Sequence, residues 1–254
     1  MIDQTIYYET HGTEQTGAPP LILLHGGVGA HEMFAAQIPL LAQARRVIAA
    51  DLQGHGRTPD TDRPLRFETM ADDVAALISA LGVRQVDIIG YSLGGGVALQ
   101  TAIRHPAAVR KLVLVSTAFR RSAFHPEVLA AMDQMGPHVA AGMQRSPLAK
   151  LYPNVNWATL FTKLADLLRR DYDWSAAVRK LRADTMLIFA DADSFLPTEI
   201  AELYRLLGGG LRDAGLDGSL RSASRLAIIP GATHYDVLSR PVVGQFAREF
   251  LDVP

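Results

Sequence analysis

The sequence contains no cysteine. This absence excludes disulfides, cysteine-ligated zinc, iron–sulfur clusters and a cysteine nucleophile. A chain of 254 residues needs no disulfide or metal ion to stabilise its fold, because a globular protein of this size buries about 70–75% of its unfolded surface. The lack of cysteine also agrees with a reducing cytoplasm, and we expect a cytoplasmic protein.

The sequence also lacks an excess of either charge and any long apolar run. Lys plus Arg total 25 and Asp plus Glu total 26, so the basic excess typical of nucleic-acid-binding proteins is missing. No stretch reaches the roughly 18 apolar residues that cross a bilayer, and the start of the chain does not resemble a signal peptide. We therefore expect a small-molecule substrate, with no nucleic-acid or membrane partner. A monomer and a homodimer are both compatible with the sequence.

The sequence does contain short apolar runs separated by helical patterns. Near-continuous runs of four or five apolar residues are typical of strands buried on both faces of a parallel sheet. They are Leu21–Leu24, Val47–Ala50, Val86–Ile89, Leu112–Val115, Met186–Ala190 and Leu226–Ile229. Residues 70–81 and 97–105 have the spacing of helices. We predict an α/β fold with a mostly parallel central sheet, helices on both faces, and an antiparallel edge strand at residues 5–10.

The alternation of strands and helices is interrupted between Phe119 and Asp184. Apolar-periodic pieces at 128–135 and 160–168 predict a helical insertion. Ligands bind beyond the carboxyl ends of the strands in such sheets, so the insertion is either a cap over the site or added core. We divide the chain into a core domain (1–118 and 185–254) and a cap (119–184). Four aromatic residues either line the pocket or form the core of the cap: Tyr152, Trp157, Phe161 and Trp174. Residues 208–224, rich in Gly, Ser, Asp and Arg, predict a long exposed loop.

The pentapeptide Gly90-Tyr91-Ser92-Leu93-Gly94 lies between a predicted strand and a predicted helix. This context is the one that a nucleophile elbow requires. The turn is so tight that positions 90 and 94 must lack side chains. It presents the hydroxyl of Ser92 at the N-terminus of a helix, where free N–H groups and the helix dipole favour negative charge. We predict a nucleophile here rather than an ordinary glycine-rich turn.

A serine nucleophile needs a base, and the base needs an acid. His234 follows the last predicted strand, and the order Ser, acid, His is the one expected for this architecture. The acid is expected directly after the strand 186–190, where both Asp191 and Asp193 occur. Spacing does not separate these two carboxylates. The other of the two is expected to be a loop residue that caps the helix beginning near Pro197.

The alternative interpretation of the glycine-rich loop at residues 25–29 is a loop that cradles a phosphate, but the sequence lacks the required spacing. A dinucleotide fingerprint built on Gly27 and Gly29 requires glycine at position 32, which is Glu32. The pair His31-Glu32 does not extend to a zinc-protease motif, because position 35 is alanine. We expect neither a cofactor nor a metal. The loop instead offers a backbone N–H to an oxyanion hole, and Leu93, the residue after the nucleophile, offers another.

With these motifs in order along nearly the whole chain, the sequence resembles the α/β-hydrolase superfamily. HGGVG at 25–29 resembles the oxyanion loop, and DLQGHGRT at 51–58 resembles the stretch after the next strand. GYSLGG at 90–95, ADAD at 190–193 and PGATH at 230–234 resemble the nucleophile, acid and histidine loops. The resemblance implies Asp193 as the acid, with Asp191 the alternative. It implies Gly27 and Leu93 as oxyanion donors, with Val28 the second choice for Gly27. His25 and Asp51 are then loop-shaping residues.

The resemblance further implies a capped serine hydrolase that uses Ser92, His234 and Asp193. The substrate class that we expect is a small, largely apolar carboxylic ester or lactone. Carbon–carbon bond hydrolases and cofactor-free perhydrolases share these motifs. Some proteins of this architecture sense ligands and turn over little. The sequence leaves these alternatives open.

Overall fold

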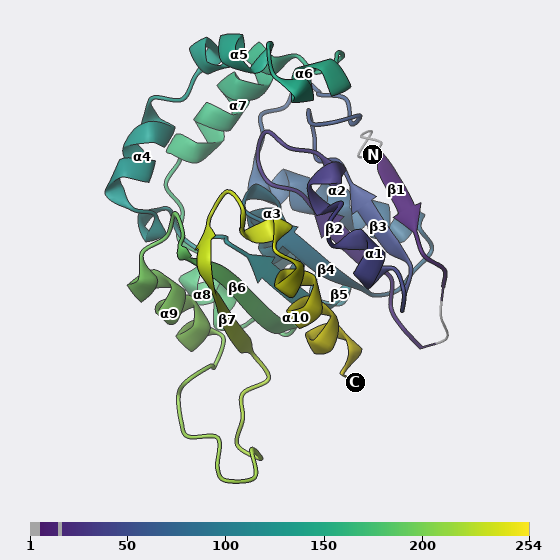
Figure 1. Cartoon of the computed structure of the whole chain (residues 1–254), viewed down its shortest axis with the longest axis vertical. Helices are drawn as coiled ribbons and strands as arrows, with labels where there is room; N and C mark the ends of the chain where they lie inside the picture. Colours follow the sequence, from purple (N-terminus) through teal and green to yellow (C-terminus); the bar gives the residue numbers. More distant parts are fainter. Residues whose placement is uncertain (1–5, 15–16, 254) are drawn as a thin grey trace.

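The computed structural model describes residues 6–14 and 17–253. Its centre is a seven-stranded sheet in the order β1-β3-β2-β4-β5-β6-β7 (Figure 1). All neighbouring strands are parallel except β1, which pairs antiparallel with β3. The strands are β1 (Tyr8–His11), β2 (Leu21–Leu24), β3 (Val47–Ala50), β4 (Val86–Tyr91), β5 (Val109–Val115), β6 (Asp184–Ala192) and β7 (Arg225–Thr233).

All the predicted strands are present, but several of their bounds differ from the prediction. The antiparallel edge strand begins at Tyr8, while Thr5 lies outside the described residues. At the other edge, the prediction that residues 230–233 form a loop is wrong. They belong to β7, because Thr233 pairs with Ala192 of the extended β6 after a register shift between Ala190 and Ala192. The irregularity lies beside the predicted acid and histidine positions.

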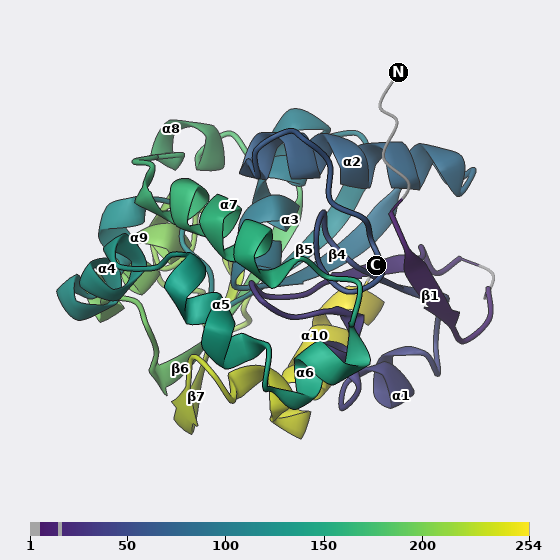
Figure 2. The same ribbon diagram turned by 90° about the horizontal axis from the view of Figure 1, so that it is seen from above.

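Helices cover both faces of the sheet, as predicted (Figure 2). Residues of α2, α3 and α9 belong to one hydrophobic core, and residues of α10 belong to the other. Ile22 and Leu24 of β2 face the first core, whereas Leu21 and Leu23 face the second. The helices are α1 (Ile38–Leu41), α2 (Phe67–Ala80), α3 (Leu93–Arg104), α4 (Pro126–Asp133), α5 (Pro137–Met143), α6 (Pro147–Leu151), α7 (Trp157–Arg169), α8 (Ser175–Val178), α9 (Pro197–Leu206) and α10 (Pro241–Asp252).

The chain between β5 and β6 is helical, which agrees with the predicted insertion. It forms α4 to α8, and α4 to α7 arch over one end of the molecule (Figure 1). The division into two domains at 118 and 185 stays a prediction. Residues 208–224 form the expected exposed loop, without helix or strand, at the opposite end of the molecule. Within the described ranges, no helix is both long and apolar enough to cross a membrane. The cytoplasmic location stays a prediction.

A buried ion network joins the amino end of β4 to its surroundings. Asp87 is fully buried and accepts hydrogen bonds from Arg45 (2.6 Å) and, through both oxygens, from Arg110 (2.9 and 2.7 Å). Arg45 is buried as well and also binds Asp252 in α10. The negative charge of Asp87 balances the guanidinium groups of Arg45 and Arg110. Without Asp87, the buried charge of Arg45 would have only Asp252 as an acidic partner.

We expect Asp87→Ala to lower the free energy of unfolding by about 3–5 kcal/mol, the usual cost of breaking a buried ion pair. The measurement is urea denaturation at neutral pH. The matched control is Glu14→Ala, which breaks the exposed pair with Arg46 and should cost no more than about 1 kcal/mol. Equal effects of the two variants would contradict a stabilising role for the buried network.

Candidate active site

Ser92 occupies a strained turn between β4 and α3. Its φ is 51°, in the left-handed region that side chains disfavour. A Cβ on Gly90 would lie 2.4 Å from the carbonyl oxygen of Gly94, and one on Gly94 would lie 2.2 Å from the carbonyl oxygen of Leu24. Both positions therefore require glycine, as the sequence predicts. The N–H of Ser92 donates to the Val115 carbonyl of the next strand at 3.0 Å, which ties the turn to the sheet.

The structure brings Ser92, His234 and Asp193 into one hydrogen-bonded chain. Ser92 Oγ lies 3.1 Å from His234 Nε2, and His234 Nδ1 lies 2.9 Å from Asp193 Oδ1. A carboxylate at Nδ1 holds the proton on that nitrogen, which leaves Nε2 free to accept the serine proton. The three side chains come from three different loops at the carboxyl edge of the sheet. Their arrangement is suited to nucleophilic attack by Ser92.

The two candidate carboxylates have different surroundings. The Asp193 side chain is only 1% exposed and contacts the imidazole of His234. Asp191 is exposed and accepts hydrogen bonds from the N–H groups of Gly231 (3.0 Å) and Ala232 (3.2 Å). The expectation that the second carboxylate caps α9 is wrong, since no side chain caps that helix. Asp191 instead holds the end of β7, from which His234 extends.

Ser116, which the sequence did not single out, supports the carboxylate of Asp193. It follows β5, is buried, has φ 45° and donates its hydroxyl to Asp193 Oδ2. Burial alone raises the pKa of Asp193, but hydrogen bonds from His234, Ser116 and the Ala190 N–H outweigh it and hold the pKa below its ordinary value. The signal in the sequence that could have identified Ser116 was its position as a polar residue directly after a buried strand. Its partner lies 77 residues away, so sequence spacing does not reveal the contact.

We expect Ser116→Ala to lower the free energy of unfolding by about 1.5–3 kcal/mol at pH 7, the range for a hydrogen bond to a charged group. A lowered folded pKa contributes stability that is complete above the unfolded value of about 4 and is lost as the pH falls through the folded value. The difference between variant and wild type should therefore shrink below about pH 4. Chemical denaturation across this pH range measures it.

The same variant should lower kcat by up to about 10²-fold, because a displaced Asp193 misorients the imidazole of His234. Ser116→Gly removes the same hydroxyl while relieving the left-handed strain. Similar losses in both variants would assign the effect to the hydroxyl. Full kcat in both would contradict a positioning role for Ser116.

Aromatic residues contact both the backbone and the ring of His234. The Tyr91 hydroxyl donates to the His234 carbonyl at 2.6 Å. The ring of Phe195 packs edge-on against the imidazole, with 5.6 Å between ring centroids. Tyr91 directly precedes Ser92, and Phe195 lies two residues after Asp193. The nucleophile and acid loops thus also restrain the histidine.

Gly27 and Leu93, the predicted oxyanion donors, lie side by side next to Ser92. Leu93 is the first residue of α3, so its N–H has no acceptor within the helix. A Cβ placed on Gly27 would lie 3.9 Å from Cβ of Leu93, so the loop of Gly27 passes close to the start of α3. Val28, the second choice, has φ 60° and lines one cavity together with Gly27, Ser92 and Leu93. Their assignment as donors stays a prediction.

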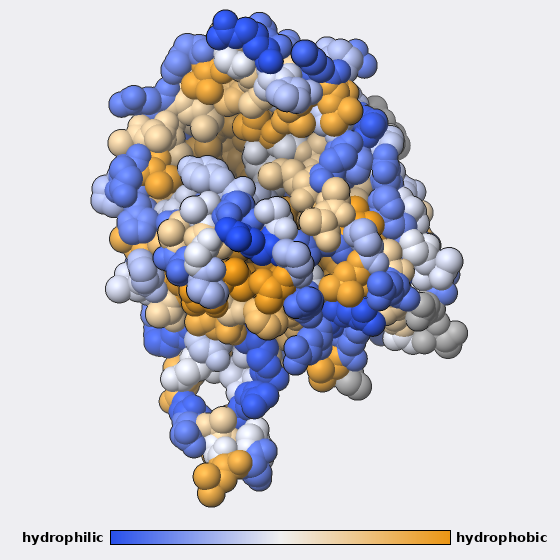
Figure 3. Space-filling model, in the orientation of Figure 1, coloured by the Kyte–Doolittle hydropathy of each residue, from blue (hydrophilic) through white to orange (hydrophobic). Residues whose placement is uncertain are grey.

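A cavity of about 270 Å³ opens at Ser92 and His234. Among the described residues, no Asp, Glu, Lys or Arg lines it. Figure 3 shows the hollow below the arch of α4–α7, with mostly apolar colouring. The helical segment and the core both contribute apolar lining residues: Val28, Phe67, Leu93, Ala118, Phe124, Val128, Ala131, Met132, Met135, Leu164, Leu168, Tyr172 and Phe195.

The four aromatic residues singled out in the insertion were expected either to line the pocket or to form the core of the cap, and they are core residues. Tyr152, Trp157 and Phe161 are buried in the hydrophobic core, and Trp174 packs against that core and stacks on Tyr172 with ring centroids 4.4 Å apart. None of these four lines the cavity, whereas Tyr172 does.

A polar cluster behind the oxyanion loop shapes the backbone. Asp51 accepts hydrogen bonds of 2.8 Å from the backbone N–H of His31, the N–H of Arg57 and Nδ1 of His31. His25 donates from Nδ1 to the Gly26 carbonyl (2.7 Å) and accepts from the Leu52 N–H (2.9 Å). Burial lowers the pKa of His25, which keeps it neutral. The predicted loop-shaping roles of His25 and Asp51 agree with these contacts.

Part of this cluster resembles a metal-binding group in its geometry. Ligand atoms of His31, Glu32 and Asp51 lie within 4.8 Å of one another. Asp51 is already engaged by N–H donors of this chain, and Glu32 pairs with Arg57 at 3.3 Å. These contacts account for the cluster without an ion, and we assign it no metal.

Comparison with known proteins supports the fold and the family. A family model described as the alpha/beta hydrolase fold matches residues 19–196. The chain belongs to the α/β-hydrolase family. The match includes the loops of Gly27, Ser92 and Asp193. An enol-lactonase structure from Burkholderia xenovorans is similar with a TM-score of 0.76 and 20% identity, over 99% of this chain and 98% of that one. At this identity the likeness concerns the fold.

Curated relatives of this α/β-hydrolase are themselves hydrolases. The chain is 43% identical over 241 residues to a pimeloyl-[acyl-carrier protein] methyl ester esterase from Neisseria meningitidis, covering 85% of this chain and 87% of that protein. It is 41% identical over 103 residues to a 2-hydroxymuconate semialdehyde hydrolase from a Pseudomonas species, covering 39% of this chain and 36% of that protein. The chain matches less than half the length of several curated relatives.

Proposed function

We propose that this α/β-hydrolase cleaves a small, largely apolar carboxylic ester or lactone through an acyl-enzyme on Ser92. The observation that carries the proposal is the series of hydrogen bonds from Ser92 through His234 to Asp193, at the mouth of an uncharged, apolar cavity. Its volume, about 270 Å³, lies just below the usual range of roughly 300–1,000 Å³ for ligand pockets. An apolar wall without cations favours a neutral acyl group, because a buried carboxylate without a partner is costly.

In the acylation step, Ser92 Oγ attacks the carbonyl carbon of the substrate while His234 Nε2 takes the proton of the Ser92 hydroxyl. Asp193 orients the imidazole and stabilises its positive charge. The carbonyl oxygen becomes an oxyanion that accepts hydrogen bonds from the N–H groups of Leu93 and Gly27. When the tetrahedral intermediate collapses, the bond to the leaving oxygen breaks, and that oxygen receives the proton held by His234.

Deacylation repeats these steps with water as the nucleophile. His234 Nε2 takes a proton from water, the hydroxide attacks the ester carbon on Ser92, and the carboxylic acid leaves as Ser92 recovers its proton from His234. A lactone follows the same route, except that the leaving hydroxyl remains attached to the acyl group.

The test is hydrolysis of p-nitrophenyl acetate, butyrate and octanoate, with γ-butyrolactone and a vinylogous diketone as further substrates. The small apolar cavity predicts turnover of the short esters or of the lactone, with preference for acetate and butyrate over octanoate. Cleavage of the diketone alone would replace ester hydrolysis by carbon–carbon bond hydrolysis. Ligand binding without turnover of any substrate would indicate a sensor, and peracid formation from acetate and hydrogen peroxide would indicate a perhydrolase.

A further inference from the structure

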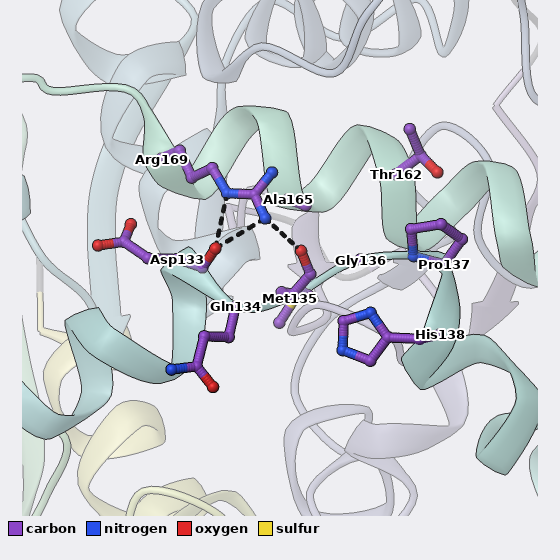
Figure 4. Close-up of a pocket in the computed structure, with 9 residues that line it drawn as sticks. All are labelled: Asp133, Gln134, Met135, Gly136, Pro137, His138, Thr162, Ala165 and Arg169. Carbon is purple, nitrogen blue, oxygen red and sulfur yellow. Dashed lines mark hydrogen bonds between the residues drawn. The ribbon is translucent and has the colours of Figure 1, made fainter.

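A second hollow adjoins the catalytic cavity within the helical segment. It has a volume of about 490 Å³ and lies between the end of α4, the start of α5 and one side of α7 (Figure 4). Its lining is more polar than that of the catalytic cavity, with Gln134, His138 and Arg169 among the lining residues. Met135, in the turn between α4 and α5, lines both the hollow and the catalytic cavity.

The two spaces share one wall, which is formed by α7 and the end of α4. Along α7, Leu164 and Leu168 line the catalytic cavity, while the next residues, Ala165 and Arg169, line the outer hollow. The same alternation occurs at the end of α4, where Met132 lines the cavity and Asp133 lines the hollow. The two spaces therefore lie against adjacent faces of the same two elements, and Met135 lines both of them.

The backbone that carries Met135 is held in place by α7. Arg169 donates two hydrogen bonds to the Asp133 carbonyl (3.0 and 2.8 Å) and another to the Met135 carbonyl (Figure 4). The Met135 side chain packs against the hydrophobic core but is only half-buried. An unbranched thioether on a fixed backbone fills an irregular gap and moves easily. Shortening this side chain should thus open the wall without releasing the turn.

We propose that Met135 determines the longest acyl chain that the enzyme accepts, and that the outer hollow receives the far end of longer chains when this side chain moves aside. The inference rests on the proposed esterase function. The catalytic cavity holds only about 270 Å³, and the hollow beyond Met135 adds further space. Met135 is therefore a specificity-determining residue rather than a catalytic one.

The experiment compares kcat/KM for p-nitrophenyl butyrate, octanoate and laurate in wild type and Met135→Ala. We expect the ratio of octanoate to butyrate, and that of laurate to butyrate, to rise at least about tenfold in the variant, the minimum that one methylene is worth in an apolar pocket. Met135→Phe should shift both ratios the opposite way. Because the two variants change the residue in opposite senses, misfolding of one leaves the other as a test.

Two neighbouring methionines provide matched controls. Met143, on α5, is half-buried and lines neither space, so Met143→Ala should leave the ratios unchanged. Met132 lines only the catalytic cavity, so Met132→Ala enlarges that cavity without breaching the wall and should not raise the laurate ratio. An equal rise in Met132→Ala and Met135→Ala, or unchanged ratios in both Met135 variants, would overturn the proposal.

A binding measurement separates this inference from the proposed function. In a Ser92→Ala background, methyl propyl ketone and methyl octyl ketone are titrated by calorimetry with and without Met135→Ala. We expect the octyl ketone to bind at least about tenfold more tightly when Met135 is shortened, and the propyl ketone to bind equally. A wild type inactive on all esters, with this binding change intact, would refute the esterase and keep the role of Met135. If the wild type is an active esterase but Met135→Ala changes neither the chain-length ratios nor ketone binding, the esterase function stands and the role of Met135 is refuted.

Discussion

Replacing Ser92 by alanine is expected to lower kcat on every ester or lactone that the enzyme turns over by on the order of 10⁴-fold or more. The variant lacks the atom that forms the acyl-enzyme, and His234 then has no proton to accept. Substrate binding should change little, because the cavity walls are untouched and the removed hydroxyl is a small part of the lining. The measurement is steady-state hydrolysis of p-nitrophenyl butyrate with purified wild type and variant.

The matched control for this variant is Ser194→Ala. Ser194 also lines the cavity, but in the described structure the ring of His234 forms its hydrogen bonds with Ser92 and Asp193. Its loss should leave most of kcat intact. Full activity of Ser92→Ala would refute the proposed mechanism, and an equally large loss in Ser194→Ala would show that the effect is not specific to the nucleophile.

The second large effect is expected from Asp193→Asn, which should lower kcat by about 10⁴-fold. An amide at this position donates where the carboxylate accepts. It therefore favours the imidazole tautomer with its proton on Nε2, which cannot take the proton of Ser92. Ser116 and the Ala190 N–H still hold the side chain, so the fold should be retained. Circular dichroism and kcat measured on the same preparation test both parts.

Asp191→Asn is the matched control, since it makes the same change two residues away. Its remaining carbonyl oxygen still accepts from the Gly231 or Ala232 N–H, so kcat should fall far less than in Asp193→Asn. A reversal of the two effects would identify Asp191 as the acid in solution. Equal effects would mean that the position of the β7 end matters as much as the charge at His234.

The local features of the fold were predictable because each depends on residues close together in the sequence. Apolar runs such as Leu21–Leu24 indicated strands that are buried on both faces. The glycines at 90 and 94 indicated a turn whose close contacts allow no side chain. The loop at 230–233 was predicted wrongly for a related reason: Pro230 and Gly231 are typical of turns, but pairing with β6 extends the strand through them.

The features that involve distant residues were not predictable in the same way. Asp191 and Asp193 are equivalent in spacing, and only their contacts with Gly231 and His234 distinguish them. Nothing near Ser116 in the sequence indicates that its hydroxyl meets Asp193. Of the aromatic residues of the helical segment, Phe124 and Tyr172 line the cavity, whereas Tyr152, Trp157, Phe161 and Trp174 do not, because helix packing decides which rings face inward.

The sequence by itself determined the strands, the strained turn at Ser92 and the order of the candidate catalytic residues, since periodicity and glycine sterics act over a few neighbouring positions. Only the tertiary structure decided which carboxylate meets His234, which hydroxyl supports it, and how large and how apolar the cavity is. These properties arise where β5, β6, β7 and the helical segment converge. The physical reason is that hydrogen bonds and cavity walls form between groups close in space, whatever their separation along the chain.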